Sequence, residues 1–330
     1  MLSPLLIITL ILVLGAEFVN GWTDAPNAIA TVVSTRVLSP GKAVLMAAVL
    51  NLAGAIATGT AVATTIGSGI VKPGAISLPV VAAAMLTILV WSGITWFYAL
   101  PSSKSHELIA GLTGAGLAAA GPSVLLWSGW EKVLIGLGFS TVIGFTFGFI
   151  IMTALYWILR RTALASIRGA FSRLQILSSA FMAFSHGSND GQKFMGVFAL
   201  TLLLGGKISH FTVPLWVMVI CGAVMGFGTI IGGWRIMRTL GFRLTRLEPV
   251  NGFAAETSGS LAILLASHFG IPLSTTHCIT TSIMGVGASR RTSAVRWGMA
   301  RSIVLTWIVT FPVCGILGYL FSLGLKAIGI

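Results

Sequence analysis

Two aspartates, Asp24 and Asp190, stand inside long apolar stretches of this chain. A charged side chain at the centre of a membrane helix costs roughly 2.5–3.5 kcal/mol on insertion scales, so acids at that depth usually face a cavity and mark an ion or proton path. Asn20, Asn27 and Asn189 flank the two acids in the sequence. Carboxylate and amide oxygens suit a hard cation, whereas an aspartate alone can carry a proton. We therefore expect these five residues to bind a coupling ion, Na⁺ or H⁺, unless the acids lie at helix ends near the membrane surface.

Other charged residues occupy similar surroundings. Lys193 follows Asp190 by three positions, so on a helix the two can pair on one face, or the lysine can attract an anion. Glu256, within FAAETSGS, is predicted to lie deep in a segment, where it serves ion coupling or pairs with a polar neighbour. Three further acids lie near predicted segment ends and are expected at the membrane interface: Glu107, Glu131 and Glu248.

Two similar motifs, PSSKSH at 101–106 and PLSTTH at 272–277, carry helix-start signals. The N-terminus of a helix offers unpaired N–H groups and a partial positive charge, which together suit an anion. If the two helix starts meet, their hydroxyl groups form a two-sided cradle for a tetrahedral oxyanion; ordinary helix capping at a membrane surface is the alternative. The hydroxyl groups belong to Ser102, Ser103, Ser105, Ser274, Thr275 and Thr276.

His106 and His277 occupy equivalent positions in these motifs, where they could form a metal pair or cap the helices. The sequence has no HExxH pattern and no P-loop pattern. Its three cysteines are scattered through apolar sequence, so no disulfide framework is predicted. We expect no resident metal or cofactor.

The motifs belong to an internal repeat. Asp24 aligns with Asp190 at an offset of 166 positions, and His106 aligns with His277 at an offset of 171. The second alignment also matches a proline, a serine and two glycines. Each half, 1–165 and 166–330, has five apolar segments, and an odd number of crossings turns the second copy upside down. Inverted repeats of this kind are typical of secondary transporters, which bind substrate at the repeat interface.

The composition indicates the fold class that must position these residues. Of 330 residues, 56% are hydrophobic and only 8% are charged. The long apolar runs predict an all-α polytopic membrane protein, because strands of a membrane β-barrel would alternate apolar and polar residues. We expect about 10–12 transmembrane helices and a first helix that is not a cleaved signal peptide. Residues 1–35 are too long for one crossing, and segments 105–121 and 277–288 are too short, so broken or re-entrant helices are predicted.

The net charge of +13 comes largely from arginines that cluster between apolar segments. This distribution is typical of cytoplasmic loops rather than of nucleic-acid binding. With every cluster cytoplasmic, the segment count places both termini on the outer side. The clusters are Arg160, Arg161, Arg168 and Arg173; Arg235, Arg238, Arg243 and Arg246; and Arg290, Arg291, Arg296 and Arg301.

The stretches NGWTDAPNAIATVVST and SHGSNDGQK, with the paired PSSKSH and PLSTTH motifs, resemble the inorganic phosphate transporter (PiT) family. The resemblance implies a homodimeric secondary transporter that moves phosphate, free or as a metal–phosphate complex, with H⁺ or Na⁺. The GQK ending of the second signature is closer to bacterial proton-coupled members. The compact chain implies a multi-pass protein of a bacterial or archaeal cytoplasmic (inner) membrane. By motif match the site falls on Asp24, Asn27, Asn189, Asp190, Ser103, Ser105, Ser274, Thr275 and Thr276.

Several functions fit these residues. The family also includes sulfate permeases, but phosphate can donate a hydrogen bond to an ionised aspartate and sulfate cannot, which favours phosphate import. An anion channel would use the same cradle without coupling. An intramembrane aspartyl protease would need two carboxyls close enough to share a proton, but it has no use for duplicated helix starts. We therefore predict a transporter and not an enzyme.

Overall fold

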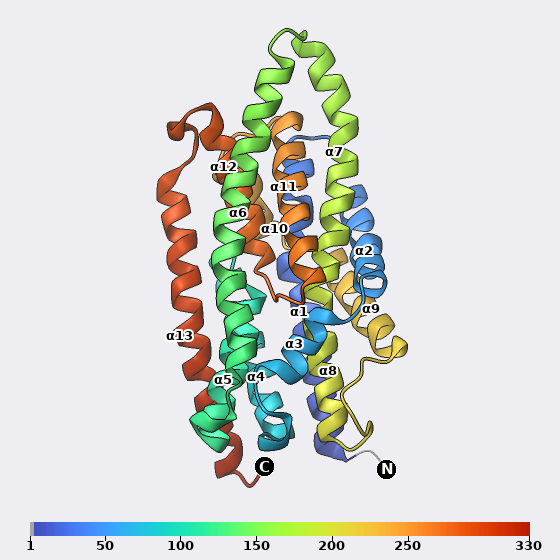
Figure 1. Ribbon diagram of the computed structural model, residues 1–330, viewed down its shortest axis with the longest axis vertical. Coiled ribbons are helices and arrows are strands. Elements are labelled where there is room, and N and C mark those ends of the chain that lie inside the picture. Colours follow the sequence, from blue (N-terminus) through green and yellow to red (C-terminus); the bar gives the residue numbers. More distant parts are fainter. Residues whose placement is uncertain (1–2) are drawn as a thin grey trace.

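The structure, a computed structural model, describes residues 3–330 as a bundle of helices (Figure 1). The first half contains α1 (Pro4–Ser34), α2 (Pro40–Ala57), α3 (Ala61–Gly69), α4 (Leu78–Phe97), α5 (Lys104–Ala120) and α6 (Trp127–Leu159). The second half contains α7 (Leu164–His186), the π-turn η3 (Gly187–Gly191), α8 (Gln192–Leu204), α9 (Leu215–Ile231), α10 (Trp234–Arg238), the π-turn η4 (Thr239–Arg243), α11 (Pro249–His268), α12 (Thr275–Arg290) and α13 (Trp297–Ala327). The prediction of an all-α architecture is confirmed.

Five helices within residues 3–330 are long and apolar enough to cross a membrane: α1, α2, α4, α6 and α13. A sixth is added if α9 and the segment Trp234–Arg243, which meet at 62°, form one broken span. The other helices are shorter or carry the polar residues that the bundle buries. The prediction of a multi-pass membrane protein is confirmed, while the number of crossings stays a prediction.

The length of the first segment, residues 1–35, predicted a helix break within it, and the structure has its breaks elsewhere. Helix α1 is continuous over 31 residues, with Pro26 inside it, so the expected break in this segment is wrong. Neighbouring helices pack around Pro26, and a proline in a membrane helix is tolerated in such surroundings. The breaks lie instead between α2 and α3 and between α9 and α10.

The two short helices, α5 and α12, begin inside the bundle. Extended segments at 100–103 and 271–274 lead into them, and Ser103 and Ser274 cap their first turns. The Oγ atoms of these serines accept hydrogen bonds from the backbone N–H groups of His106 and His277, at 3.4 and 3.2 Å. Residues at both helix starts are buried. The expectation that segments 105–121 and 277–288 are interrupted within the membrane is therefore consistent with the structure.

The interior is divided into two apolar clusters with polar residues between them. One cluster gathers side chains mainly from α1, α2, α11 and α12, and the other from α3, α4, α5 and α8. Each half ends in a long helix, α6 in the first half and α13 in the second. The short helices pack on these across the halves, α5 against α13 and α12 against α6. The buried polar residues thus lie in a bundle whose apolar side chains form two clusters.

Candidate functional site

The starts of α5 and α12 meet at the centre of the molecule. The Ser105 hydroxyl donates to the carbonyl of Leu273 over 2.8 Å. The rings of His106 and His277 lie edge to face, 4.5 Å between centroids, and the His277 ring also stacks on Trp307. The two histidines therefore pack against each other, and the capping role expected of them falls to the neighbouring serines instead.

Asp24 projects from α1 into the groups at the start of α12. One of its carboxylate oxygens accepts hydrogen bonds from Asn27 Nδ2 at 3.2 Å and from Thr276 Oγ1 at 3.1 Å. Asn27 Nδ2 itself lies 3.0 Å from Thr276 Oγ1. The other carboxylate oxygen lies 3.9 Å from Lys104 Nζ. The acid of the first half is thus tied to hydroxyl groups of the second half.

Asp190 lies in the π-turn η3 and is bonded on both oxygens. Lys193 Nζ donates to one oxygen, and Thr275 Oγ1 donates to the other over 2.8 Å. His186 Nε2 lies 3.2 Å from the same oxygen as Thr275. The wider turn of a π-helix places His186, Asp190 and Lys193 on one side of the chain. Such single π-turns are frequent at functional sites.

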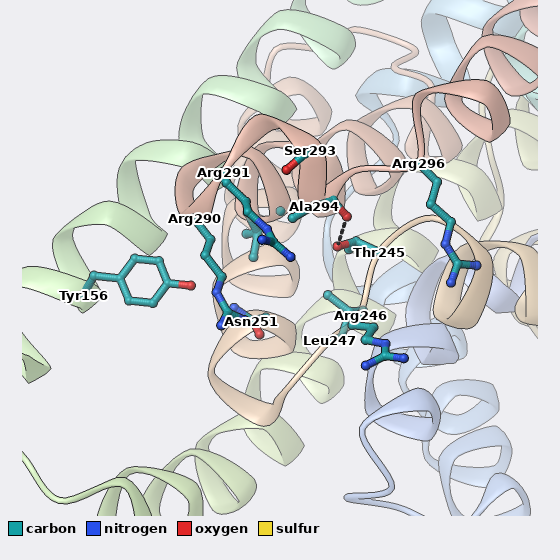
Figure 2. Close-up of a pocket in the computed structure, with 12 residues that line it drawn as sticks. Tyr156, Thr245, Arg246, Leu247, Asn251, Arg290, Arg291, Ser293, Ala294 and Arg296 are labelled. Carbon is teal, nitrogen blue, oxygen red and sulfur yellow. Dashed lines mark hydrogen bonds between the residues drawn. The ribbon is translucent and has the colours of Figure 1, made fainter.

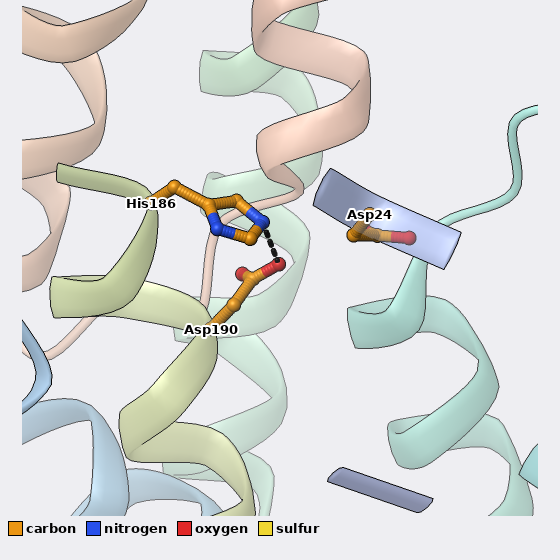
Figure 3. A group of neighbouring side chains, drawn as sticks. All are labelled: Asp24, His186 and Asp190. Carbon is orange, nitrogen blue, oxygen red and sulfur yellow. Dashed lines mark ion pairs between the residues drawn. The ribbon is translucent and has the colours of Figure 1, made fainter. Parts of the chain in front are cut away.

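Asp24, His186 and Asp190 form a buried group (Figure 3). Each offers one ligand atom, and these atoms all lie within 4.8 Å of one another. Figure 3 shows His186 and Asp190 facing each other, with Asp24 on a separate helix across from them. Two carboxylate oxygens and an imidazole nitrogen at this spacing suit a cation or a shared proton.

A second lysine, Lys104, is fully buried at the start of α5. Its Nζ donates to Glu107 Oε1 at 2.8 Å and lies 3.3 Å from Ser102 Oγ. Ser102 and Ser92 also donate to the Glu107 carboxylate. The expectation that Glu107 is interfacial is wrong, because α5 starts inside the bundle and its first turn is enclosed. Glu131 and Glu248 are exposed, as expected.

Three predicted ion ligands bond elsewhere. Asn20 Nδ2 donates to Glu17 at 2.9 Å, and Asn189 Nδ2 donates to Ser267 Oγ at 2.9 Å. Glu256 is fully buried, as predicted, but accepts hydrogen bonds from Thr31, Ser178 and Gln175. These residues therefore bond to other partners and not to Asp24 or Asp190.

Three residues of the centre were not predicted as site residues. Lys104 and Glu107 lie three positions apart in the motif KSHE, the spacing of an ion pair on one helix face, which was a usable signal. His186 stands four positions before Asp190, also on one helix face. Ionisable residues inside apolar segments are functional candidates by default, so both pairs could have been found from the sequence.

The charges of the centre are largely paired within the protein, with one carboxylate more than there are lysines. Two lysines face three carboxylates, and hydroxyl groups complete the hydrogen bonds. Buried ions persist only when they are paired in this way.

Comparisons with known proteins show which family the chain resembles. Residues 20–318 match the family model described as "Phosphate transporter family". The chain is 43% identical over 318 residues to the "Probable low-affinity inorganic phosphate transporter" of Rhizobium meliloti (strain 1021), covering 96% of this chain and 95% of the relative. It is 41% identical to the protein of the same description in Bacillus subtilis (strain 168), covering 95% and 96%.

A solved structure, "The sodium-dependent phosphate transporter", has the same fold. Its TM-score is 0.86 at 24% sequence identity, and the match covers 99% of this chain and 100% of that one. The expected resemblance is therefore confirmed over nearly the whole sequence. The chain belongs to the phosphate transporter family, a family of transporters and not of enzymes.

Proposed function

We propose that this protein imports inorganic phosphate by symport with a cation and binds it between the starts of α5 and α12. The observation that carries the proposal is the meeting of both Ser/Thr helix starts with Asp24, Asp190 and their lysines in one buried centre. The names of the curated relatives support the same substrate.

Phosphate suits the hydrogen-bonding groups of this centre better than sulfate does. Lys104 and Lys193 offer positive charge, and Thr275 and Thr276 offer hydroxyl donors. The carboxylates only accept hydrogen bonds while ionised. Hydrogen phosphate carries a proton that it can donate to Asp24, whereas sulfate would set a second negative charge against that carboxylate.

We also propose that residues 1–165 and 166–330 are inverted repeats. The packing of the helices supports this division, because each contact has a counterpart: α5 with α13 matches α12 with α6, and α2 with α7 matches α9 with α1. Close approaches recur at aligned glycines. A Cβ on Gly21 would lie 2.1 Å from the Met225 carbonyl oxygen, and one on Gly187 would lie 2.1 Å from that of Asn51.

H⁺ is the coupling ion that the contacts of Lys193 favour. Its ammonium group bonds to the Asp190 carboxylate and to the Leu273 carbonyl, 2.8 Å away. These are oxygen ligands of the kind that a bound Na⁺ takes, and the ammonium group of Lys193 stands in the position that the ion would take between them. In the first half the aligned residue is Asn27, which leaves Asp24 as the proposed proton carrier.

The remaining assignments rest on the family resemblance. We propose a homodimer in a bacterial or archaeal cytoplasmic membrane, with both termini on the outer side. A metal–phosphate complex is the alternative cargo that the Asp24, His186 and Asp190 ligand group supports.

Uptake of radiolabelled phosphate into proteoliposomes tests the proposal. We expect accumulation against a gradient, driven by an inward pH gradient and unchanged when Na⁺ replaces K⁺. An excess of unlabelled sulfate should compete poorly. Absence of phosphate uptake at every pH and sodium level would refute phosphate symport. Equilibration without accumulation would indicate a channel instead.

A further inference from the structure

Beyond the central site, four arginines line a separate cavity of about 370 Å³ at one end of the bundle (Figure 2). Arg246 comes from the segment before α11, Arg290 and Arg291 from the end of α12, and Arg296 from the turn before α13. Tyr156 of α6 completes one wall, and Figure 2 shows its hydroxyl group turned toward Arg290. The cavity thus gathers cationic groups from several elements onto one small volume.

The guanidinium groups around this cavity have no carboxylate partner within the described part of the chain. All salt bridges found among residues 3–330 belong to the central site, and none involves these arginines. The nearest acid in sequence, Glu248, caps α11 with Asn251. Four positive charges without protein counter-ions attract an anion, and guanidinium groups match phosphoryl oxygens in a bidentate manner.

Hydrogen bonds hold the floor of the cavity in place. The Thr245 hydroxyl donates to the Ala294 carbonyl over 3.0 Å, and the Arg296 backbone N–H donates to the Leu244 carbonyl over 3.0 Å. A Cβ on Gly287 would lie 3.1 Å from Thr245 Oγ1, so α12 packs tightly on this segment. The backbone segments that carry the arginines are therefore held at set positions around one cavity.

The arginines are not needed to build this part of the fold. The first half has a backbone hydrogen bond that corresponds to the one between Arg296 and Leu244. There the Leu126 backbone N–H donates to the Ile70 carbonyl over 3.0 Å. With the offset of 171 positions, the residues aligned with Arg290 and Arg291 are Ala119 and Ala120. Membrane orientation requires positive charge somewhere in the loop, but it does not require a shared cavity.

We propose that this cavity, here called the arginine pocket, is a second anion site that binds a phosphoryl group away from the central site. The length of α12 separates the two sites by about 22 Å at 1.5 Å per residue. The phosphoryl group can belong to the headgroup of an anionic lipid or to a soluble phosphate compound. Because the pocket joins the end of α12 to the segment before α11, its ligand ties that segment to the helix whose start carries Thr275 and Thr276.

The test compares three full-length proteins purified in neutral detergent: the wild type, Arg290→Gln/Arg291→Gln, and Arg160→Gln/Arg161→Gln. The last variant removes the same charge from a basic pair that does not line the pocket. One arm titrates inorganic pyrophosphate by calorimetry at constant ionic strength. The other measures binding of phosphatidylglycerol and of zwitterionic phosphatidylcholine by native mass spectrometry. A probe that also enters the central site contributes equally to all three proteins.

We expect at least one probe, pyrophosphate or phosphatidylglycerol, to bind the wild type and the Arg160/Arg161 variant alike. Its affinity should fall about tenfold or more in the Arg290/Arg291 variant, since charge-assisted hydrogen bonds are lost. The arm in which the affinity falls shows whether the phosphoryl group belongs to a soluble compound or to a lipid headgroup. Equal weakening in both variants, or equal binding by all three proteins, would overturn the proposal. If the double variant fails to fold, Arg246→Gln, which removes one guanidinium group from the opposite wall, replaces it under the same criteria.

Discussion

At the scale of residues, the lysines determine which acids of the centre are neutralised by the protein itself. Lys193 bonds directly to Asp190, and Lys104 bonds directly to Glu107. Asp24 has only neutral donors within hydrogen-bond distance. The two aligned aspartates therefore differ in their partners. Asp190, paired with Lys193, is suited to hold a fixed charge, and Asp24 is suited to exchange a proton.

Asp190→Asn tests the fixed charge. The substitution leaves Lys193 buried without its carboxylate, and breaking a buried ion pair from one side costs about 3–5 kcal/mol of unfolding free energy. We expect a matching loss of thermal stability in detergent and loss of phosphate uptake.

The double variant Asp190→Asn/Lys193→Met serves as the control. It removes both charges, so it should recover much of the stability while uptake stays lost. Normal uptake by this folded double variant would show that the ion pair has no part in transport.

At the start of α12, the hydroxyl groups of Thr275 and Thr276 donate to Asp190 and Asp24. Replacing both with valine keeps their shape and removes the donors. We expect the half-saturation concentration for phosphate to rise about tenfold, because two hydrogen bonds to charged groups are lost. Thr280→Val is the matched control, since Thr280 lies on the same helix and its hydroxyl has no partner in the described structure. An equal rise in the control would exclude a specific role of the cradle.

At the scale of elements, α5 and α12 position the centre because the long helices hold them closely. A Cβ on Gly114 would lie 1.9 Å from the Gly315 carbonyl oxygen of α13, and a Cβ on the aligned Gly285 would lie 2.1 Å from the Phe145 carbonyl oxygen of α6. The clash is with backbone, which cannot move aside. These glycines therefore set the distance between each short helix and its long partner.

Gly114→Ala should separate α5 from α13. We expect a loss of about 1–3 kcal/mol, the usual effect of overpacking, together with reduced uptake. Gly138→Ala is the control, because nothing lies within 4 Å of its Cβ position and alanine favours a helix. Melting curves of the purified proteins measure the difference. A Gly114→Ala variant as stable as wild type would contradict the close approach.

The features that could be predicted from the sequence are the ones that local chemistry decides. The starts of α5 and α12 followed from their serine caps, and the depth of Asp24 and Asp190 followed from their apolar surroundings. The continuity of α1 through Pro26 could not be predicted, because neighbouring helices decide it. The burial of Glu107 was missed for the same reason, since it depends on how deep α5 begins.

At the scale of the whole molecule, both termini lie at one end of the bundle, and the turn between α6 and α7 lies at the other (Figure 1). That turn carries the first arginine cluster, including Arg160 and Arg161. Positively charged loops are retained on the cytoplasmic side. The distribution of charge along the bundle therefore agrees with the proposed outward termini.

Single cysteines introduced by Ser3→Cys and Ser293→Cys test this orientation in intact cells. Both positions are exposed, and the native Cys221, Cys278 and Cys314 are buried, so they react slowly with an impermeant maleimide. We expect labelling at position 3 from outside, and at position 293 only after the membrane is opened. The reverse pattern would contradict the proposed outward termini and would place the arginine pocket outside the cell, where cytoplasmic phosphoryl compounds cannot reach it.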